Sequence, residues 1–96
     1  MKVKNGILKG ELKVKGGKLI KCTLGLQNGK IRDIRITGDF FMYPEEAIER
    51  LEKALEGIHF DEKNIKKAVG KALEDVELIG VAADDFVAAI MSSKLI

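Results

Sequence analysis

The sequence has few of the residues that often carry chemistry or cross-links. Its 96 residues include no tryptophan, one cysteine, one histidine and one proline. The single Cys22 excludes an internal disulfide and is typical of a protein kept in a reducing compartment. A zinc site built from Cys22 and His59 would need unusual carboxylate support. We therefore expect neither a disulfide nor a metal site.

Long apolar runs are also missing. No stretch approaches the roughly 18 consecutive apolar residues that a membrane span needs. The opening residues, Met1-Lys2-Val3-Lys4, do not resemble a signal peptide. We therefore expect a cytoplasmic protein that makes no contact with membranes.

Aromatic residues make up only 5% of the chain, so the core must consist mainly of Ile, Leu, Val and Ala. Hydrophobic residues account for 46% and charged residues for 33%, which is typical of a folded protein and argues against disorder. At this length we expect a single domain over residues 1–96 with one modest core.

The charges are divided unevenly along the chain. Residues 1–35 hold ten Lys or Arg and two acidic residues, a net charge of +8, whereas residues 36–96 hold seven and thirteen, a net charge of −6. A basic half could attract a nucleic acid, an anionic substrate or an acidic protein. Lysines on the solvent face of strands also deter edge-to-edge aggregation. The charge pattern leaves these alternatives open.

Residues 8–38 show the alternation of an antiparallel three-stranded β-meander. The first strand is predicted at Lys9–Lys15, and Gly16-Gly17 is expected to form a tight two-residue turn. Lys18–Gln27 is the longest predicted strand, with apolar side chains on one parity. Asn28-Gly29 then gives the strongest hairpin signal, because both residues tolerate the positive φ of a type I′ turn.

Two positions interrupt this alternation, and the residues before the meander are ambiguous. Gly25 lies in the middle of a strand, which suggests a bulge or a close approach by another group. Ile31 falls on the opposite parity from Ile34 and Ile36, so we expect a local bulge in the third strand. Residues 1–7 form a lead-in with a possible short edge strand at Lys2–Lys4.

About three helices are predicted over residues 44–96. Pro44 suits the first helical position, and Gly57 is a natural stop for that helix. Asp61 is expected to cap a second helix that continues to about Val76. Asp84 is expected to cap a short last helix, after a hydrophobic connector at residues 78–81. The order of strands followed by helices favours an α+β fold in which the helices cover one face of the meander.

The residues show no catalytic constellation. Cys22 lies on the apolar parity of its strand and is interpreted as a small core residue. His59 has no partner of the right type nearby, so a linker or capping role is favoured. Gly16-Gly17-Lys18 lacks the spacing of a phosphate-binding loop and joins two strands. Asp39, between a glycine and two aromatics, could cap a turn or contact a partner. We expect no catalytic and no cofactor-binding residue.

Nucleic-acid binding is the alternative function. Basic residues with strand spacing could form a charged sheet face: Lys13, Lys15, Lys18, Lys21, Arg32 and Arg35. Aromatic residues are not interleaved with them, so a base-stacking platform is not supported.

Several stretches together resemble a known family. Gly16–Ile20, Asn28–Ile36 and Gly38–Phe41, followed by a Glu-rich helix ending in Leu55-Glu56-Gly57, are similar to the C-terminal accessory domain of lipoate–protein ligases. The resemblance runs from about Leu12 through Gly57. It returns at residues 84–86, which are similar to the acidic cap of that domain's final helix.

The resemblance implies a division of labour between two chains. This chain would be the stand-alone small subunit of a split ligase, since 96 residues cannot also contain the large catalytic domain. It would bind the catalytic subunit as a heterodimer and enable ATP-dependent activation of lipoate to lipoyl-adenylate. ATP, Mg²⁺ and lipoate are expected in the catalytic partner. The lipoyl group would then pass to a lysine on an acceptor domain of a 2-oxoacid dehydrogenase or on a glycine cleavage protein.

The partner interface is predicted at the turn between sheet and first helix. Its main candidates are Gly38, Asp39, Phe40 and Phe41, with weaker basic candidates at Lys13, Lys18 and Lys21. The alternative for Phe40 and Phe41 is a contact with the chain's own core.

Overall fold

The computed structural model describes residues 4–96. The edge strand suggested at Lys2–Lys4 lies outside these residues except for Lys4, which is not in a strand.

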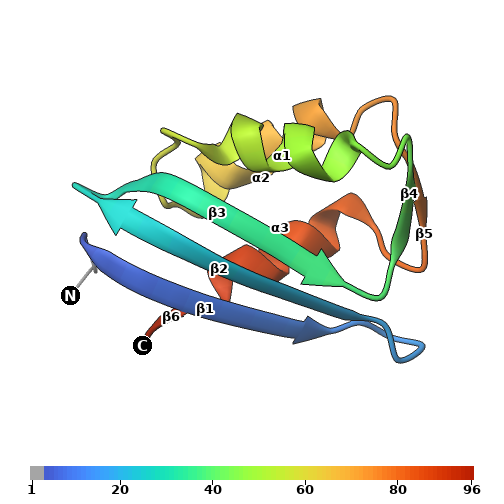
Figure 1. The fold of residues 1–96 in the computed structure, drawn as a ribbon, viewed down its shortest axis with the longest axis horizontal. Helices are drawn as coiled ribbons and strands as arrows, with labels where there is room; N and C mark the ends of the chain where they lie inside the picture. The colour runs from blue at the N-terminus through green and yellow to red at the C-terminus, as the bar shows by residue number, and fades with distance from the viewer. Residues whose placement is uncertain (1–3) are drawn as a thin grey trace.

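The main sheet is antiparallel and has four strands in the order β3-β2-β1-β6 (Figure 1). β1 (Gly6–Lys13), β2 (Leu19–Gln27) and β3 (Lys30–Gly38) form the predicted meander. The first strand was predicted at Lys9–Lys15, whereas β1 begins within the expected lead-in and ends at Lys13. The fourth strand, β6 (Lys94–Leu95), comes from the end of the chain and pairs with β1. The prediction of three strands was therefore incomplete, because a two-residue strand has no alternation by which to recognise it.

The two hairpin turns differ in length. Asn28 and Gly29 have φ values of 54° and 78°, as the predicted two-residue turn between β2 and β3 requires. The predicted two-residue turn at Gly16-Gly17 was wrong. The loop there has three residues, 15–17, and is closed by a hydrogen bond from the Val14 N–H to the Lys18 carbonyl (2.7 Å).

The predicted bulge is present in β3. Gly25 is paired with Asp33 and the next residue, Leu26, with Ile31, so Arg32 is the additional residue. The extra residue returns Ile31 to the inner face, where its side chain is fully buried.

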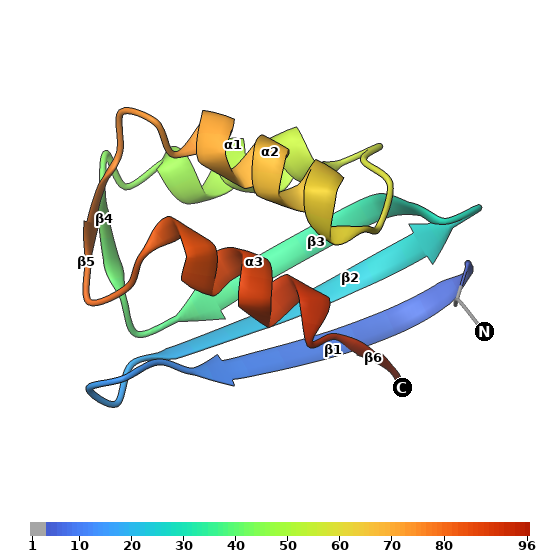
Figure 2. The same ribbon diagram turned by 180° about the vertical axis from the view of Figure 1, so that it is seen from behind.

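Within residues 4–96, three helices cover one face of the main sheet, and no helix lies on its other face (Figures 1 and 2). They are α1 (Ala47–Leu55), α2 (Glu62–Ala72) and α3 (Ala83–Met91). α1 packs on β3, α3 packs on β1 and β2, and α2 packs against the other two helices. This arrangement confirms the α+β prediction. Within residues 4–96, no helix is long and apolar enough to cross a bilayer.

The helix boundaries were predicted with mixed success. Asp61 caps α2 by accepting the Asn64 N–H (2.8 Å), and Gly57 ends α1 with a φ of +83°. Pro44 is not the first helical residue, because it opens a turn in which its carbonyl accepts the Ala47 N–H (3.0 Å). α2 ends at Ala72, four residues before Val76.

The cap of α3 also differs from the prediction. The cap residue is Ala82, and Asp84 lies in the first turn of the helix. The capping carboxylate belongs to Asp85, which reaches back to accept the Ala82 N–H (2.7 Å). An acidic residue does stabilise this end of the helix, but from inside its first turn.

A separate two-stranded ribbon closes one end of the molecule. β4 (Phe41–Tyr43) and β5 (Glu77–Ile79) pair antiparallel and lie at the end where β3 finishes (Figure 1). The connector predicted at residues 78–81 therefore overlaps a strand. Each strand has three residues, too few for a periodic pattern.

One hydrophobic cluster fills the space between the sheet and the helices. It includes Cys22, as predicted, and no polar or charged residue of the described chain is buried. Its largest fully buried side chains are mainly aliphatic, with Phe86 the largest: Leu8, Ile20, Leu24, Leu26, Ile31, Leu51, Leu55, Ile65, Val69, Phe86 and Ile90.

The outer edge of β3 is closed by α1 and the connector after it. The Ile36 N–H donates to the Glu52 carboxylate (2.7 Å). Further along the edge, the Gly57 N–H donates to the Ile31 carbonyl (2.7 Å), and the Ile31 N–H donates to the Ile58 carbonyl (2.9 Å). The helical layer is thus joined to the sheet by backbone hydrogen bonds as well as by apolar packing.

Candidate partner interface

Asp39 joins the end of β3 to the start of β2. Its carboxylate accepts the Leu19 N–H (2.6 Å), and its own N–H donates to the Leu19 carbonyl (3.3 Å). These two hydrogen bonds close the sheet where the ladder ends. Asp39 therefore has the turn-capping role suggested by the sequence, and its exposed side chain stays a candidate for contact with a partner as well.

Gly38 and Phe40 are also engaged within the chain. A Cβ atom on Gly38 would meet the Leu19 carbonyl oxygen and would lie 2.7 Å from the Phe40 ring, so no side chain fits there. Phe40 is half-buried and packs edge-on against Phe86, with ring centroids 5.0 Å apart. The core alternative thus applies to Phe40.

Phe41, in contrast, points into solvent. β4 alternates, so Met42 is buried while Phe41 and Tyr43 are 61% and 53% exposed. Ile79 lies opposite Phe41 on β5 and is 44% exposed. We call these three side chains the ribbon face. Sequence reasoning missed Tyr43 and Ile79, because a strand of three residues is too short to show alternation.

Lys18 lies beside the ribbon face. Its ammonium nitrogen is 6.0 Å from the centre of the Phe41 ring, a distance at which a cation and an aromatic ring attract weakly. Its aliphatic stem lies so close to Gly80 that a Cβ atom there would be 3.1 Å from Lys18 Cγ. The other two basic candidates, Lys13 and Lys21, lie on the outer face of the main sheet. The structure therefore separates Lys18 from them.

A groove runs next to the ribbon face, between the end of β3 and the start of α1. Its volume is about 360 Å³, and Phe40, Met42 and Ile48 contribute apolar lining. Phe41 and Tyr43 also line it. An exposed apolar ridge and an apolar groove are thus adjacent at this end of the molecule.

A second hollow, of about 640 Å³, lies among β1, α3 and the connector that follows α1. Leu8, Phe60, Met91 and Leu95 supply its apolar lining. None of the seven predicted interface residues lines it.

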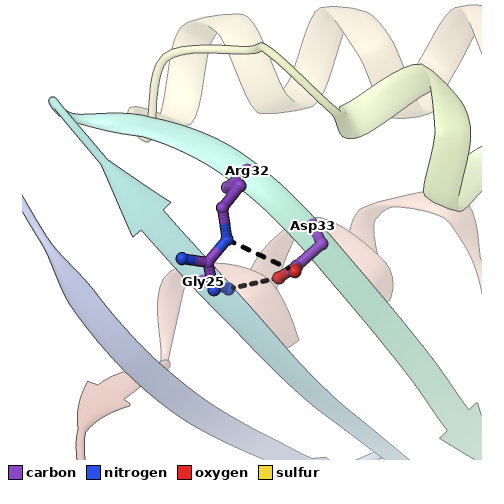
Figure 3. A network of polar contacts seen from close by, with 3 residues as sticks. All are labelled: Gly25, Arg32 and Asp33. Carbon is purple, nitrogen blue, oxygen red and sulfur yellow. Dashed lines mark hydrogen bonds and ion pairs between the residues drawn. The ribbon is translucent and has the colours of Figure 1, made fainter.

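The outer face of the main sheet is polar. It carries six cations from β1, β2 and β3, which are Lys9, Lys13, Lys21, Lys30, Arg32 and Arg35. The acids Glu11 and Asp33 lie on the same face. At the bulge, the Arg32 Nε donates to Asp33 (3.4 Å), and the other Asp33 oxygen accepts the Gly25 N–H (3.1 Å; Figure 3). A Cβ atom on Gly25 would collide with the Arg32 guanidinium. Gly25 therefore allows the arginine to fold back over the strand.

The chemistry-bearing side chains do not gather at a site. The Cys22 sulfur lies 3.2 Å from the Ser93 hydroxyl, and burial raises the pKa of the thiol despite hydrogen bonds from Ser93 and Gly10 that lower it. A protonated, buried thiol is a poor nucleophile. His59 is exposed in the connector and lies opposite Lys30. In the part of the chain that the structure describes, no three His, Cys, Asp or Glu residues are arranged to hold a metal ion.

The chain was compared with known proteins. Residues 8–90 match the family described as the C-terminus of bacterial lipoate protein ligase. Lipoate-protein ligase A subunit 2 of Thermoplasma acidophilum is 41% identical over 74 residues, which cover 75% of this chain and 76% of that protein.

The fold matches a solved structure from the same organism. The structure comes from a study of an archaeal lipoylation system, a bipartite lipoate protein ligase and its E2 lipoyl domain. The matching chain has a TM-score of 0.81 and 34% sequence identity, over 96% of this chain and 99% of that one. Sequence and fold agree, and the chain belongs to the family of lipoate protein ligase C-terminal domains.

Proposed function

We propose that this chain is the non-catalytic accessory subunit of a two-chain lipoate–protein ligase. One observation carries the proposal. The fold matches, over almost the full length of both chains, a chain from a study of a bipartite ligase. The 41% identity to a protein named as subunit 2 of such a ligase supports the same conclusion.

In this proposal the reacting groups belong to the catalytic partner. That partner holds ATP, Mg²⁺ and lipoate and forms lipoyl-adenylate. The lipoyl group then passes to a lysine on an acceptor domain, such as that of a 2-oxoacid dehydrogenase or a glycine cleavage protein. The present chain contributes binding energy to this reaction, and its one thiol, buried and protonated, is a poor nucleophile.

An accessory chain can promote a reaction by selecting one conformation of its partner. It does so only if it binds that conformation more tightly, because equal affinity for two conformations leaves the equilibrium between them unchanged. We infer that this chain favours the adenylate-forming state of the catalytic subunit through contacts that exist in that state alone. Adenylate formation should then depend on it more strongly than transfer does.

The first experiment measures ATP- and lipoate-dependent pyrophosphate release by the cognate catalytic chain. We expect release to rise at least tenfold when this chain is added in equimolar amount, which corresponds to about 1.4 kcal/mol of activation free energy. Transfer from preformed lipoyl-adenylate to the acceptor should change much less. Full release by the catalytic chain alone would contradict the proposal, as would turnover by the present chain alone.

Binding of nucleic acid is the alternative function, and the cations on the outer face of the sheet favour it. Retention on DNA or RNA would then weaken steeply with salt. The ion pair between Arg32 and Asp33 and the presence of Glu11 on the same face reduce the charge available for phosphate contacts. Salt-dependent retention together with an inactive ligase assay would favour this function over the accessory one.

A further inference from the structure

We propose that the ribbon face, together with the groove beside it, is the surface that docks the catalytic ligase chain. This inference rests on the proposed function, because it assigns a place to the partner which that function requires. The surface consists of Phe41, Tyr43 and Ile79, the groove next to them, and Lys18 at one side.

The first argument is the exposure of large apolar side chains. Phe41 and Tyr43 stand side by side on β4 and leave more than half of their surface in water. Exposed apolar clusters mark interaction sites on folded proteins, and aromatic residues are enriched among those that dominate binding energy. Among residues 4–96, the other exposed large apolar side chains are not aromatic and lie on β1, at the end of α3, and on or next to β6: Ile7, Met91, Leu95 and Ile96.

The second argument is the shape of the surface. The ridge formed by Phe41 and Tyr43 borders a groove of about 360 Å³ whose lining includes Phe40 and Ile48. A partner side chain of apolar character can enter this groove while the ridge packs against the partner's surface. Such interlocking supplies the complementarity found at the centre of stable interfaces.

The third argument is that the ribbon is already held in place. Met42 is buried and Leu78 is packed against the core, so the inner side of each strand anchors the outer side. The ribbon therefore loses little conformational freedom on binding, which favours affinity.

The fourth argument is charge, which gives the partner its chemistry. Lys18 flanks Phe41, whereas Glu77 is paired with Tyr43, and Glu45 lines the groove. The surface is thus apolar at the centre, basic on one side and acidic on the other. The matching surface of the catalytic chain would carry an apolar side chain for the groove, a carboxylate facing Lys18 and a cation facing the two glutamates.

The test is isothermal titration of the cognate catalytic chain with variants of this chain. Phe41→Ala and Ile79→Ala each remove an exposed side chain, and we expect each to weaken the complex about tenfold or more. Leu95→Ala is the matched control, because Leu95 is equally apolar and 54% exposed but lies on β6, away from the ribbon. It should change the affinity less than twofold. Thermal unfolding confirms that each variant is folded.

Two variants that each reverse one charge provide an independent measurement. Lys18→Glu places a negative charge beside the ribbon face and should weaken the complex about tenfold at low salt, with a smaller effect at high salt. Lys21→Glu makes the same charge change on the outer face of the sheet and should have little effect on affinity.

The outcomes separate this inference from the function on which it rests. If the wild-type chain forms no complex with the catalytic chain, the proposed function itself fails. If the complex forms but only Leu95→Ala or Lys21→Glu weakens it, the function stands and the docking surface is elsewhere. If Phe41→Ala instead abolishes self-association measured by sedimentation and leaves the ligase complex intact, the ribbon face binds a second copy and the inference is overturned.

Discussion

Neighbouring residues of the turn at Gly38–Phe41 have opposite roles. Asp39 and Gly38 hold the strands together, Phe40 faces Phe86, and Phe41 faces water. The sequence identified this tetrapeptide as important but could not assign a separate role to each residue. Those roles depend on contacts with Leu19 and Phe86, which are distant along the chain. The structure distinguishes Phe40, which packs against the core, from Phe41, which is exposed.

Gly38 gives a stability prediction with a control in the same chain. In Gly38→Ala the new Cβ would meet the rigid Leu19 carbonyl, so we expect a loss of about 1–3 kcal/mol in the free energy of unfolding. In Gly70→Ala, in the last turn of α2, the new Cβ meets nothing within 4 Å, so helix propensity should stabilise the protein by about 0.5–1 kcal/mol. Urea unfolding measures both. If both variants changed the free energy of unfolding in the same direction, the packing described for Gly38 would be contradicted.

Cys22 gives a prediction about alkaline pH. Burial raises the pKa of its thiol in the folded state, so the unfolded chain releases the thiol proton at a lower pH than the folded chain does. The free energy of unfolding should therefore be unaffected by this group below about pH 8.5 and should fall above it, until the folded thiol also ionises.

The measurement is urea unfolding at pH 7 and at pH 9.5 for the wild type and for Cys22→Ala. Because other groups titrate in both proteins, the difference between the two pH dependences isolates the thiol. The wild type should lose more stability between the two pH values than the variant. Parallel losses would show that the thiol ionises equally in both states.

At the scale of the element, β3 illustrates how an edge strand is closed without another strand. Glu52 on α1 accepts the Ile36 N–H, and the connector after α1 pairs with Ile31. The helix therefore does more than cover the core, because it also removes hydrogen-bonding groups on which another chain could form a strand.

Glu52 can be tested directly. Glu52→Ala removes the acceptor and should lower the free energy of unfolding by about 1 kcal/mol, whereas Glu52→Gln keeps an acceptor oxygen and should lower it by less. Glu49→Ala, on the exposed side of α1, is the control and should have a smaller effect than Glu52→Ala. Chemical denaturation of the three variants measures these differences. A loss as large for Glu49→Ala as for Glu52→Ala would contradict the edge-closing role.

Elements of different length were predictable to different degrees. The long strands, the Asn28-Gly29 turn and the bulge near Ile31 followed from alternation and turn chemistry, which are local. β4, β5 and β6 could not be predicted in this way, because strands of two or three residues show no alternation and are defined only by pairing with another strand. The same limit explains why Tyr43 and Ile79 were missing from the predicted interface. Their shared face exists only once β4 has paired with β5.

At the scale of the molecule, the two halves of the sequence become two layers. The basic first part forms most of the main sheet and gives its outer face six cations, whereas the acidic second part forms the helices. The difference in charge between the two layers could be predicted from the sequence, because the meander and the helices are consecutive in the chain. At one end of the molecule, Lys18 from the loop between β1 and β2 lies on one side of the ribbon face, and Glu45 and Glu77 from the second part lie on the other.

The pairing of β6 with β1 also decides how the protein can be handled. The Ile96 N–H donates to the Ile7 carbonyl (3.1 Å), so the last residues run along β1 and away from the ribbon, in a molecule whose longest dimension is 35 Å. A sensor chip or a fluorophore attached through a linker after Ile96 would leave the ribbon face turned toward solution. Immobilised in this way, every molecule would present the same surface to a soluble partner.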